Sequence, residues 1–215
     1  LPAHSYAADN ASSISSAARV TQQGQMFNEA MRFIAINLQY NQQELDAPSV
    51  FVVTSARASE GKTSITANLG IALGQIGHDT IVVDMDFRRP NLHNVFQLEN
   101  EEGVTAALSL RVNIKEVMSQ TEHENLRVIT TGMVPPDPIQ LFRSKRMKEL
   151  LDELKQEAEY IIIDSAPLLP VADTPALLLQ SEATILVVDQ SATKRRAIAQ
   201  AANEVRSSAT RATFT

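Results

Sequence analysis

The stretch SVFVVTSARASEGKTSITANLG, residues 49–70, places a hydrophobic run, a polar loop and a helical pattern in direct succession. Gly61, Lys62 and Thr63 match the end of the phosphate-binding pattern G-x-x-x-x-G-K-[ST], and Ala56 stands where its first glycine would be. The preceding strand and following helix favour a phosphate loop over a chance Gly-Lys-Thr. We therefore predict that the whole loop contacts a nucleotide: Ala56, Arg57, Ala58, Ser59, Glu60, Gly61, Lys62, Thr63 and Ser64.

The chemistry of this loop follows from its position before a helix. Backbone N–H groups and the positive end of the helix dipole would face phosphate. Lys62 would reach the β- and γ-phosphates, and the Thr63 hydroxyl would bind Mg²⁺.

Carboxylates follow two further hydrophobic runs, TIVVD and YIIID. Because the carboxyl ends of parallel strands meet at one edge of a sheet, Asp84, Asp86 and Asp164 are expected to converge on the loop. Asp164 has the form of a Walker B aspartate, and Asp86, Asp164 and Thr63 are the predicted Mg²⁺ ligands. A single aspartate after a strand often only caps the next helix. Three at converging strand ends favour a site for metal and nucleotide.

Arg88 and Arg89 come directly after these acids and leave two interpretations open. Their guanidinium groups suit phosphate, an acidic substrate or a neighbouring subunit, and equally suit salt bridges to the nearby aspartates.

Short apolar runs alternate with helical patterns along the chain. The runs are residues 49–54, 80–84, 126–131, 160–164 and 183–189; the helical patterns cover residues 26–38, 62–77, 139–157 and 171–180. Continuously apolar strands separated by helices predict a doubly wound α/β fold with a mostly parallel sheet. We expect one domain at residues 25–208, a flexible Ser/Ala-rich linker at residues 1–24 and an unassigned tail at residues 209–215.

Composition narrows the class of protein. The 215 residues are 44% hydrophobic, which is enough for a packed core. The net charge of −6 argues against a nucleic-acid partner, and the absence of cysteine excludes disulfides and thiolate metal sites. No apolar run is long enough to span a membrane.

The motifs together resemble the bacterial tyrosine kinases, the ATPase-fold partners of polysaccharide chain-length regulators. The resemblance rests on residues 53–96, on TGMVPPDPIQLFRS and on YIIIDSAPLLPVADTPALL, and it extends from about Glu29 to Ala202. It implies a P-loop NTPase fold similar to MinD and ParA, and phosphoryl transfer from ATP, with Mg²⁺, to tyrosine. Lys62, Asp84, Asp86 and Asp164 would be the catalytic residues, with Asp84 as first candidate for the general base.

The resemblance also implies partners and a location. A transmembrane chain-length regulator, in the same or a separate chain, would hold the domain in the cytoplasm at the inner face of the cell membrane. The kinase would then act in capsule or exopolysaccharide polymerisation and export. Homo-oligomers would form through the helix that carries Glu29 and Arg32.

This chain departs from the family pattern at several places. The oligomerisation motif E-x-x-R-x-x-R has Ala35 in place of its second arginine, and Ala58-Ser59 replaces the usual Pro-Gly. The three tyrosines are Tyr6, Tyr40 and Tyr160, so the family's C-terminal tyrosine cluster is missing, and RSSATRATFT stands where a last strand like GVVLN is expected. A domain truncated before its last strand, or an altered reading frame, would explain both differences.

Two other functions stay open. The missing tyrosines and Ala35 favour a non-catalytic ATP-binding module that regulates a membrane copolymerase. A MinD/ParA-like ATPase switch is the other alternative, in which Arg57 would partly replace a lysine that reaches the partner's nucleotide. ATP-dependent dimerisation that Arg57→Ala abolishes would favour the switch.

Overall fold

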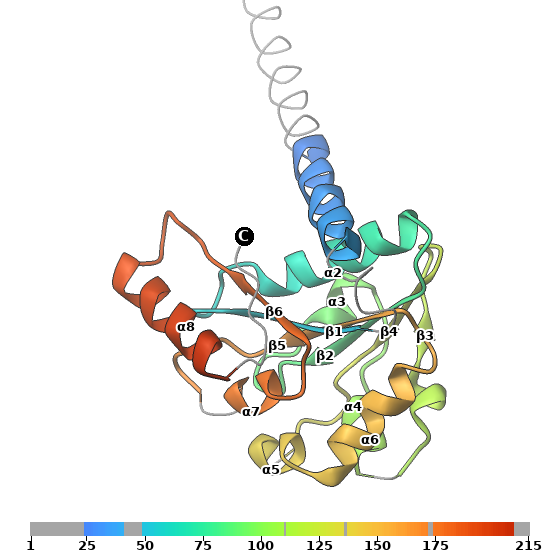
Figure 1. Cartoon of the computed structure of the whole chain (residues 1–215). Coiled ribbons are helices and arrows are strands. Elements are labelled where there is room, and N and C mark those ends of the chain that lie inside the picture. The colour runs from blue at the N-terminus through green and yellow to red at the C-terminus, as the bar shows by residue number, and fades with distance from the viewer. Residues whose placement is uncertain (1–23, 41–48, 110, 136, 172–173, 209–215) are drawn as a thin grey trace, which may run out of the picture.

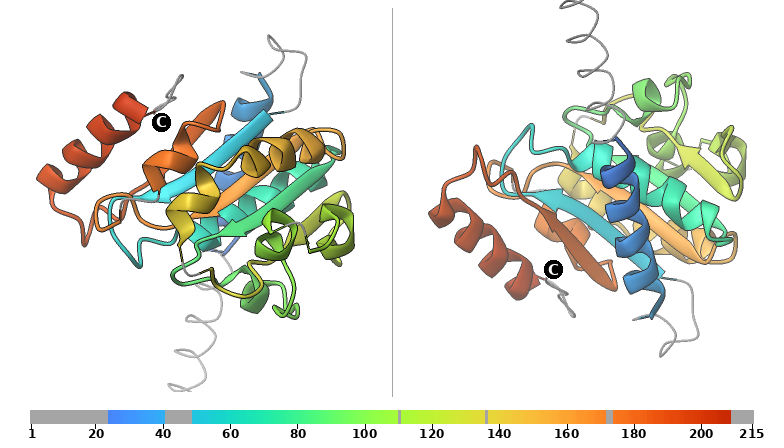
Figure 2. Two further views of the ribbon diagram at one scale, coloured as in Figure 1. Left: turned by 90° about the horizontal axis from the view of Figure 1, so that it is seen from below. Right: turned by 90° about the horizontal axis from the view of Figure 1, so that it is seen from above.

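A computed structural model describes residues 24–40, 49–109, 111–135, 137–171 and 174–208, with helices on both faces of a central sheet (Figures 1 and 2). The expected tail at residues 209–215 lies outside the described residues, as does the expected linker apart from Gly24, which begins a helix over residues 24–40.

The sheet has six strands in the order β3-β4-β2-β5-β1-β6. Their bounds are β1 Ser49–Ser55, β2 Thr80–Met85, β3 Ser119–Gln120, β4 Leu126–Ile129, β5 Tyr160–Ser165 and β6 Ala183–Val187. All pairs are parallel except β3–β4, a short antiparallel edge that the sequence patterns did not indicate. After β1 the chain forms β2, the edge strand β3 and then β4 on one side of the sheet. It returns to place β5 between β1 and β2, and it forms β6 on the other side of β1. This reversal opens a crevice at the carboxyl ends of β1, β2 and β5.

Nine helical segments connect and cover these strands in the described residues. They are residues 24–40, α2 Lys62–Gln75, α3 Leu92–Val95, α4 Val104–Leu108, the 3₁₀ helix η1 Ile114–Val117, α5 Pro138–Phe142, α6 Lys145–Leu154, α7 Thr174–Leu178 and α8 Arg195–Ser208. Helix 24–40 and α2 pack on one face of the sheet, whereas α4, α6, α7 and α8 pack on the other (Figure 2). The doubly wound α/β prediction is therefore confirmed.

The central strands are buried on both faces, which explains why they appear as continuous apolar runs in the sequence. Every residue of β1, β2 and β5 is buried, as their continuous apolar runs predict. β6 is only half-buried because it is the outer strand of the sheet in the described residues.

Two helix predictions need correction. The single helix expected over residues 139–157 is two, because the chain turns at Arg143 and the Ser144 side chain caps α6 by accepting from the Met147 N–H. Helix 24–40 exists, but the apolar face that helical spacing predicts, with Met26, Ala30, Ile34 and Leu38, is only partly buried. Leu38 is 9% exposed and Met26 is 66% exposed, whereas Ala35 is fully buried. Helical spacing alone could not reveal which side of this helix meets the sheet, because exposed apolar residues occur on its other side.

Candidate functional site

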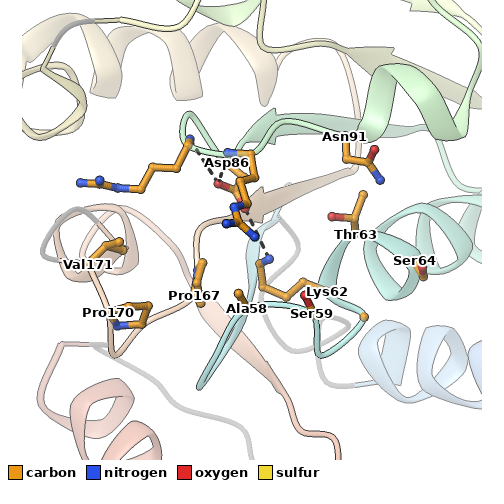
Figure 3. A pocket seen from close by; sticks show the side chains of 13 residues that line it. Ala58, Ser59, Lys62, Thr63, Ser64, Asp86, Asn91, Pro167, Pro170 and Val171 are labelled. Atoms are coloured by element: carbon orange, nitrogen blue, oxygen red, sulfur yellow. Dashed lines mark hydrogen bonds and ion pairs between the residues drawn. The ribbon is translucent and has the colours of Figure 1, made fainter.

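The phosphate loop joins β1 to α2 at the carboxyl edge of the sheet. Gly61 precedes α2 with φ +86°, in the left-handed region that glycine adopts without strain, and its carbonyl accepts the Ile65 N–H at 2.9 Å. The loop borders a cavity of about 490 Å³, shown in Figure 3. Its lining residues are Ala58, Ser59, Gly61, Lys62, Thr63, Ser64, Asp86, Arg88, Arg89, Asn91, Pro167, Pro170 and Val171.

Lys62 and Asp86 form the ion pair at the centre of this cavity. Lys62 Nζ lies 3.4 Å from Asp86 Oδ2, and both side chains are less than a tenth exposed (Figure 3). The other Asp86 oxygen accepts the backbone N–H groups of Arg88 and Arg89, at 3.3 and 3.0 Å. The pair therefore presents one positive and one negative group, each fixed in direction, where a phosphate and its cation would enter.

Asp164 lies at the end of β5 beneath the start of α2. Its carboxylate accepts from the Thr63 hydroxyl at 2.6 Å and from the Thr66 hydroxyl at 3.3 Å. Burial is the main reason that the pKa of Asp164 rises to about 7; the Thr63 bond and Lys62 oppose this rise.

The oxygens of Thr63, Asp86 and Asp164 fit Mg²⁺, a hard cation that prefers oxygen ligands. In the described part of the chain, no cluster of three or more His, Cys, Asp or Glu side chains forms a metal site on its own.

Asp84 has a different environment from Asp86, although the two are two residues apart. It is fully buried, and one oxygen accepts the Asn91 and Leu92 N–H groups, both at 2.9 Å. The other oxygen accepts the Asp86 N–H at 3.2 Å. Burial raises the pKa of Asp84, and these backbone hydrogen bonds oppose the rise. Asp84 therefore holds the loop between β2 and α3 and does not line the cavity.

The structure brings most of the predicted residues together. Six residues of the phosphate loop and Asp86 line the cavity, and Asp164 is bonded to Thr63 directly behind it. Three predicted nucleotide contacts do not line the cavity: Ala56, Arg57 and Glu60. Ala56 is fully buried and Arg57 is exposed.

Four lining residues were not singled out from the sequence, namely Asn91, Pro167, Pro170 and Val171. They lie on the loops that follow β2 and β5. The sequence could have indicated these two loops, because ligands of parallel sheets bind beyond the carboxyl ends of the strands, but it gave no indication of which residues in them line the cavity.

Ser59 is strained in this loop. Its φ of +66° lies in the left-handed region, which disfavours residues with a Cβ. We expect Ser59→Gly to raise the free energy of unfolding by about 0.5–1 kcal/mol, because relieved strain outweighs the greater entropy of the unfolded glycine chain. Urea unfolding would measure it. Ser64→Gly, in the first turn of α2, is the control and should lower stability by a similar amount.

Comparison with known proteins relates this chain to tyrosine-protein kinases. Residues 49–212 match the family described as AAA domain. The chain is 32% identical over 182 residues to the tyrosine-protein kinase YwqD of Bacillus subtilis, covering 85% of this chain and 76% of YwqD. It is 30% identical over 159 residues to a putative tyrosine-protein kinase in the cps region of Klebsiella pneumoniae, covering 74% of this chain and 22% of that protein.

Two solved structures extend the comparison. The chimerical protein CapA2B2 superposes with a TM-score of 0.79 at 29% identity, covering 84% of this chain and 79% of that one. The septum site-determining protein MinD of Pyrococcus horikoshii, complexed with Mg-ADP, superposes with a TM-score of 0.55 at 26% identity, covering 66% and 58%. Within the described residues, no helix has the length and apolar character needed to cross a bilayer.

Proposed function

This chain belongs to the AAA-domain family and, within it, to the bacterial tyrosine kinases, and we propose that its cavity binds ATP with Mg²⁺ and transfers the γ-phosphoryl group to tyrosine. The observation that carries the proposal is the buried pair of Lys62 and Asp86 at the N-terminus of α2, with Asp164 behind it. A cation, a helix N-terminus and one carboxylate at the cavity, with a second carboxylate behind it, supply both signs of charge that a metal–nucleotide complex needs.

Lys62 and the loop backbone would bind the phosphates. The Lys62 ammonium already lies in the cavity, so only a small movement from Asp86 toward a phosphate oxygen is required. The positive end of the α2 dipole adds to this attraction. Lys62 would neutralise charge that spreads over the phosphoryl oxygens during transfer.

Thr63, Asp86 and Asp164 are the residues that we propose to hold Mg²⁺, Asp164 directly or through water. When bound, the ion would screen the phosphate charge and orient the γ-phosphoryl group. Thr63 is positioned for this role by its 2.6 Å hydrogen bond to Asp164.

Asp84 remains our first candidate for the general base that takes the tyrosine proton. The raised pKa of its carboxyl suits proton acceptance, but its oxygens are engaged by three backbone N–H groups. Asp84 is also fully buried and does not line the cavity, so it would have to move before it could reach a tyrosine hydroxyl. Asp86, which lines the cavity, is the alternative base.

We extend the proposal to partners. A membrane-bound chain-length regulator would hold the domain at the inner face of the cell membrane, in the assembly of a surface polysaccharide; the relative in the cps region supports this assignment. Self-association would use helix 24–40, where the side chains of Glu29 and Arg32 are exposed. Glu29 Oε1 lies 3.9 Å from Arg32 Nη1. Residue 35, where the family pattern has a second arginine, is fully buried here, so this helix cannot present that arginine position to a neighbour.

Two of the three tyrosines lie in the described residues, and they differ as phosphate acceptors. Tyr40 is 73% exposed, whereas Tyr160 is 2% exposed and stacks on Phe51. Burial also raises the pKa of Tyr160 to about 12, which keeps its hydroxyl protonated. We therefore predict that Tyr40→Phe removes most autophosphorylation and that Tyr160→Phe, which keeps the stacked ring, leaves it unchanged.

Incubation with radiolabelled ATP and Mg²⁺, with and without a tyrosine-containing acidic copolymer, tests both statements. Label on the copolymer establishes the kinase, and label retained in Tyr40→Phe would assign the acceptor to Tyr6. If neither the protein nor the copolymer is labelled although ATP binds tightly, the proposed kinase function is wrong. That result would favour the non-catalytic regulatory module.

A further inference from the structure

The side chain of Glu60 is turned away from the phosphate site, although the residue lies in the middle of the phosphate loop. It does not line the cavity, and it is only 9% exposed. A carboxylate that faced the cavity would repel phosphate. Its burial on the opposite side of the loop needs a partner of its own.

Glu60 finds its partners on two segments. One oxygen accepts the Arg57 N–H at 2.6 Å, within the phosphate loop itself. The other accepts the Thr193 hydroxyl, and the Asp189 N–H at 3.4 Å. Thr193 and Asp189 lie between β6 and α8, more than 120 residues further along the chain. A single carboxylate thus joins two loops that only the fold brings together.

Hydrogen bonds within the loop between β6 and α8 hold this loop in one conformation. The Asp189 carbonyl accepts the Ala192 and Thr193 N–H groups, at 3.2 and 2.9 Å. Its carboxylate accepts the Ser191 N–H and hydroxyl, at 2.8 and 2.6 Å. These bonds close a tight turn that fixes Thr193, itself only 7% exposed, toward Glu60.

The opposite side of the phosphate loop is also held. Leu168 and Leu169, after β5, donate backbone N–H groups to the carbonyls of Ser55 and Ala56. The Ser55 hydroxyl donates to the Arg57 carbonyl at 2.6 Å. Two hydrogen bonds therefore hold the Arg57 backbone: Ser55 donates to its carbonyl, and Glu60 accepts its N–H. Loss of the Glu60 carboxylate would remove the second.

We propose that Glu60 is a positioning residue for nucleotide binding, which fixes the phosphate loop to the β6–α8 loop through Thr193. The bond matters most before ATP binds, when no phosphate orders the loop. Ala58 and Ser59, which stand between Arg57 and Glu60, lack the restraint of a proline, and Ser59 is strained. The Glu60 bonds would hold these two residues in the conformation that receives phosphate. This inference rests on the proposed ATP site but not on phosphotransfer.

Equilibrium titration with a fluorescent ATP analogue and Mg²⁺ tests the role of Glu60. We expect Thr193→Val to weaken binding about tenfold, because it removes the hydroxyl that donates to the Glu60 carboxylate. Glu60→Gln should weaken binding at least as much, because it removes the negative charge that all three hydrogen bonds to Glu60 share. Thr193→Ser, which keeps the hydroxyl, should bind as the wild type does. The double variant Glu60→Gln/Thr193→Val should bind no more than about twofold more weakly than Glu60→Gln alone, because Thr193 acts through the Glu60 carboxylate.

Ser181→Ala is the matched control. Its hydroxyl is equally buried and donates to the Leu178 carbonyl before β6, at the end of that strand away from Thr193. It should lower stability without changing the dissociation constant. Where a kinase assay is possible, the KM for ATP should rise in Thr193→Val while kcat stays within about twofold. Unchanged binding in Thr193→Val, or fully additive losses in the double variant, would overturn the proposal. Wild-type protein that binds the analogue but transfers no phosphate would contradict only the kinase function.

Discussion

Lys62→Met is expected to lower phosphotransfer by at least about 10³-fold, the range found when a charge that stabilises transferring phosphate is lost. Lys62 Nζ forms an ion pair with Asp86, an aspartate that lines the cavity. Methionine keeps the length and apolar stem of the side chain but cannot neutralise phosphate. Initial rates with radiolabelled ATP would measure the loss.

The same substitution should also affect the fold. It leaves Asp86, which is 3% exposed, without its counter-charge, and we expect a loss of about 1–3 kcal/mol in the free energy of unfolding. The double variant Lys62→Met/Asp86→Asn should regain most of this stability while remaining inactive. If the double variant regained activity as well, or if Lys62→Met alone kept wild-type rates, Lys62 would not be the phosphate-binding lysine.

Asp164→Asn is expected to change stability and activity in opposite directions. Burial places the pKa of Asp164 at about 7, against 3.8 for an exposed aspartate. The neutral form therefore stabilises the fold fully below about pH 3.8, and this contribution is lost as pH rises to about 7 and beyond. Without metal or nucleotide, the wild type should lose on the order of 2 kcal/mol at this group between about pH 5 and pH 8.

Asparagine carries no charge at any of these pH values, so Asp164→Asn should gain that amount relative to the wild type over the same interval. Its kinase rate should nevertheless fall by about 10²–10³-fold, because a proposed Mg²⁺ ligand is lost. Urea unfolding in a chelator, compared with rates in Mg²⁺, would measure both. Asp152→Asn, at an exposed position on α6, is the control, with a change within about 0.5 kcal/mol. If the stability difference between Asp164→Asn and the wild type did not vary with pH, burial would not be raising the pKa of Asp164.

Much of the site could be predicted because its signals are local. Gly61, Lys62 and Thr63 are consecutive, and the hydrophobic runs before Asp84 and Asp164 identify strand ends without any knowledge of the fold. That these strand ends meet at one edge follows from the general rule for parallel sheets, whereas the structure supplies the order that places β5 between β1 and β2.

The direction of each side chain could not be predicted in the same way. Asp84 and Asp86 look equivalent in the motif, yet Asp86 faces the cavity while the Asn91 and Leu92 N–H groups hold Asp84 in the core. Glu60 was predicted to contact nucleotide, but its carboxylate is bonded on the other side of the loop.

The sequence by itself therefore determined the doubly wound fold, the phosphate loop and the set of acids around it, because strand burial, helix periodicity and loop chemistry depend on neighbouring residues. Only the tertiary structure decided which acids face the cavity and what holds the loop in place. Those outcomes depend on hydrogen bonds between distant segments, such as Thr63 with Asp164 and Glu60 with Thr193, which form only after the sheet has brought them together.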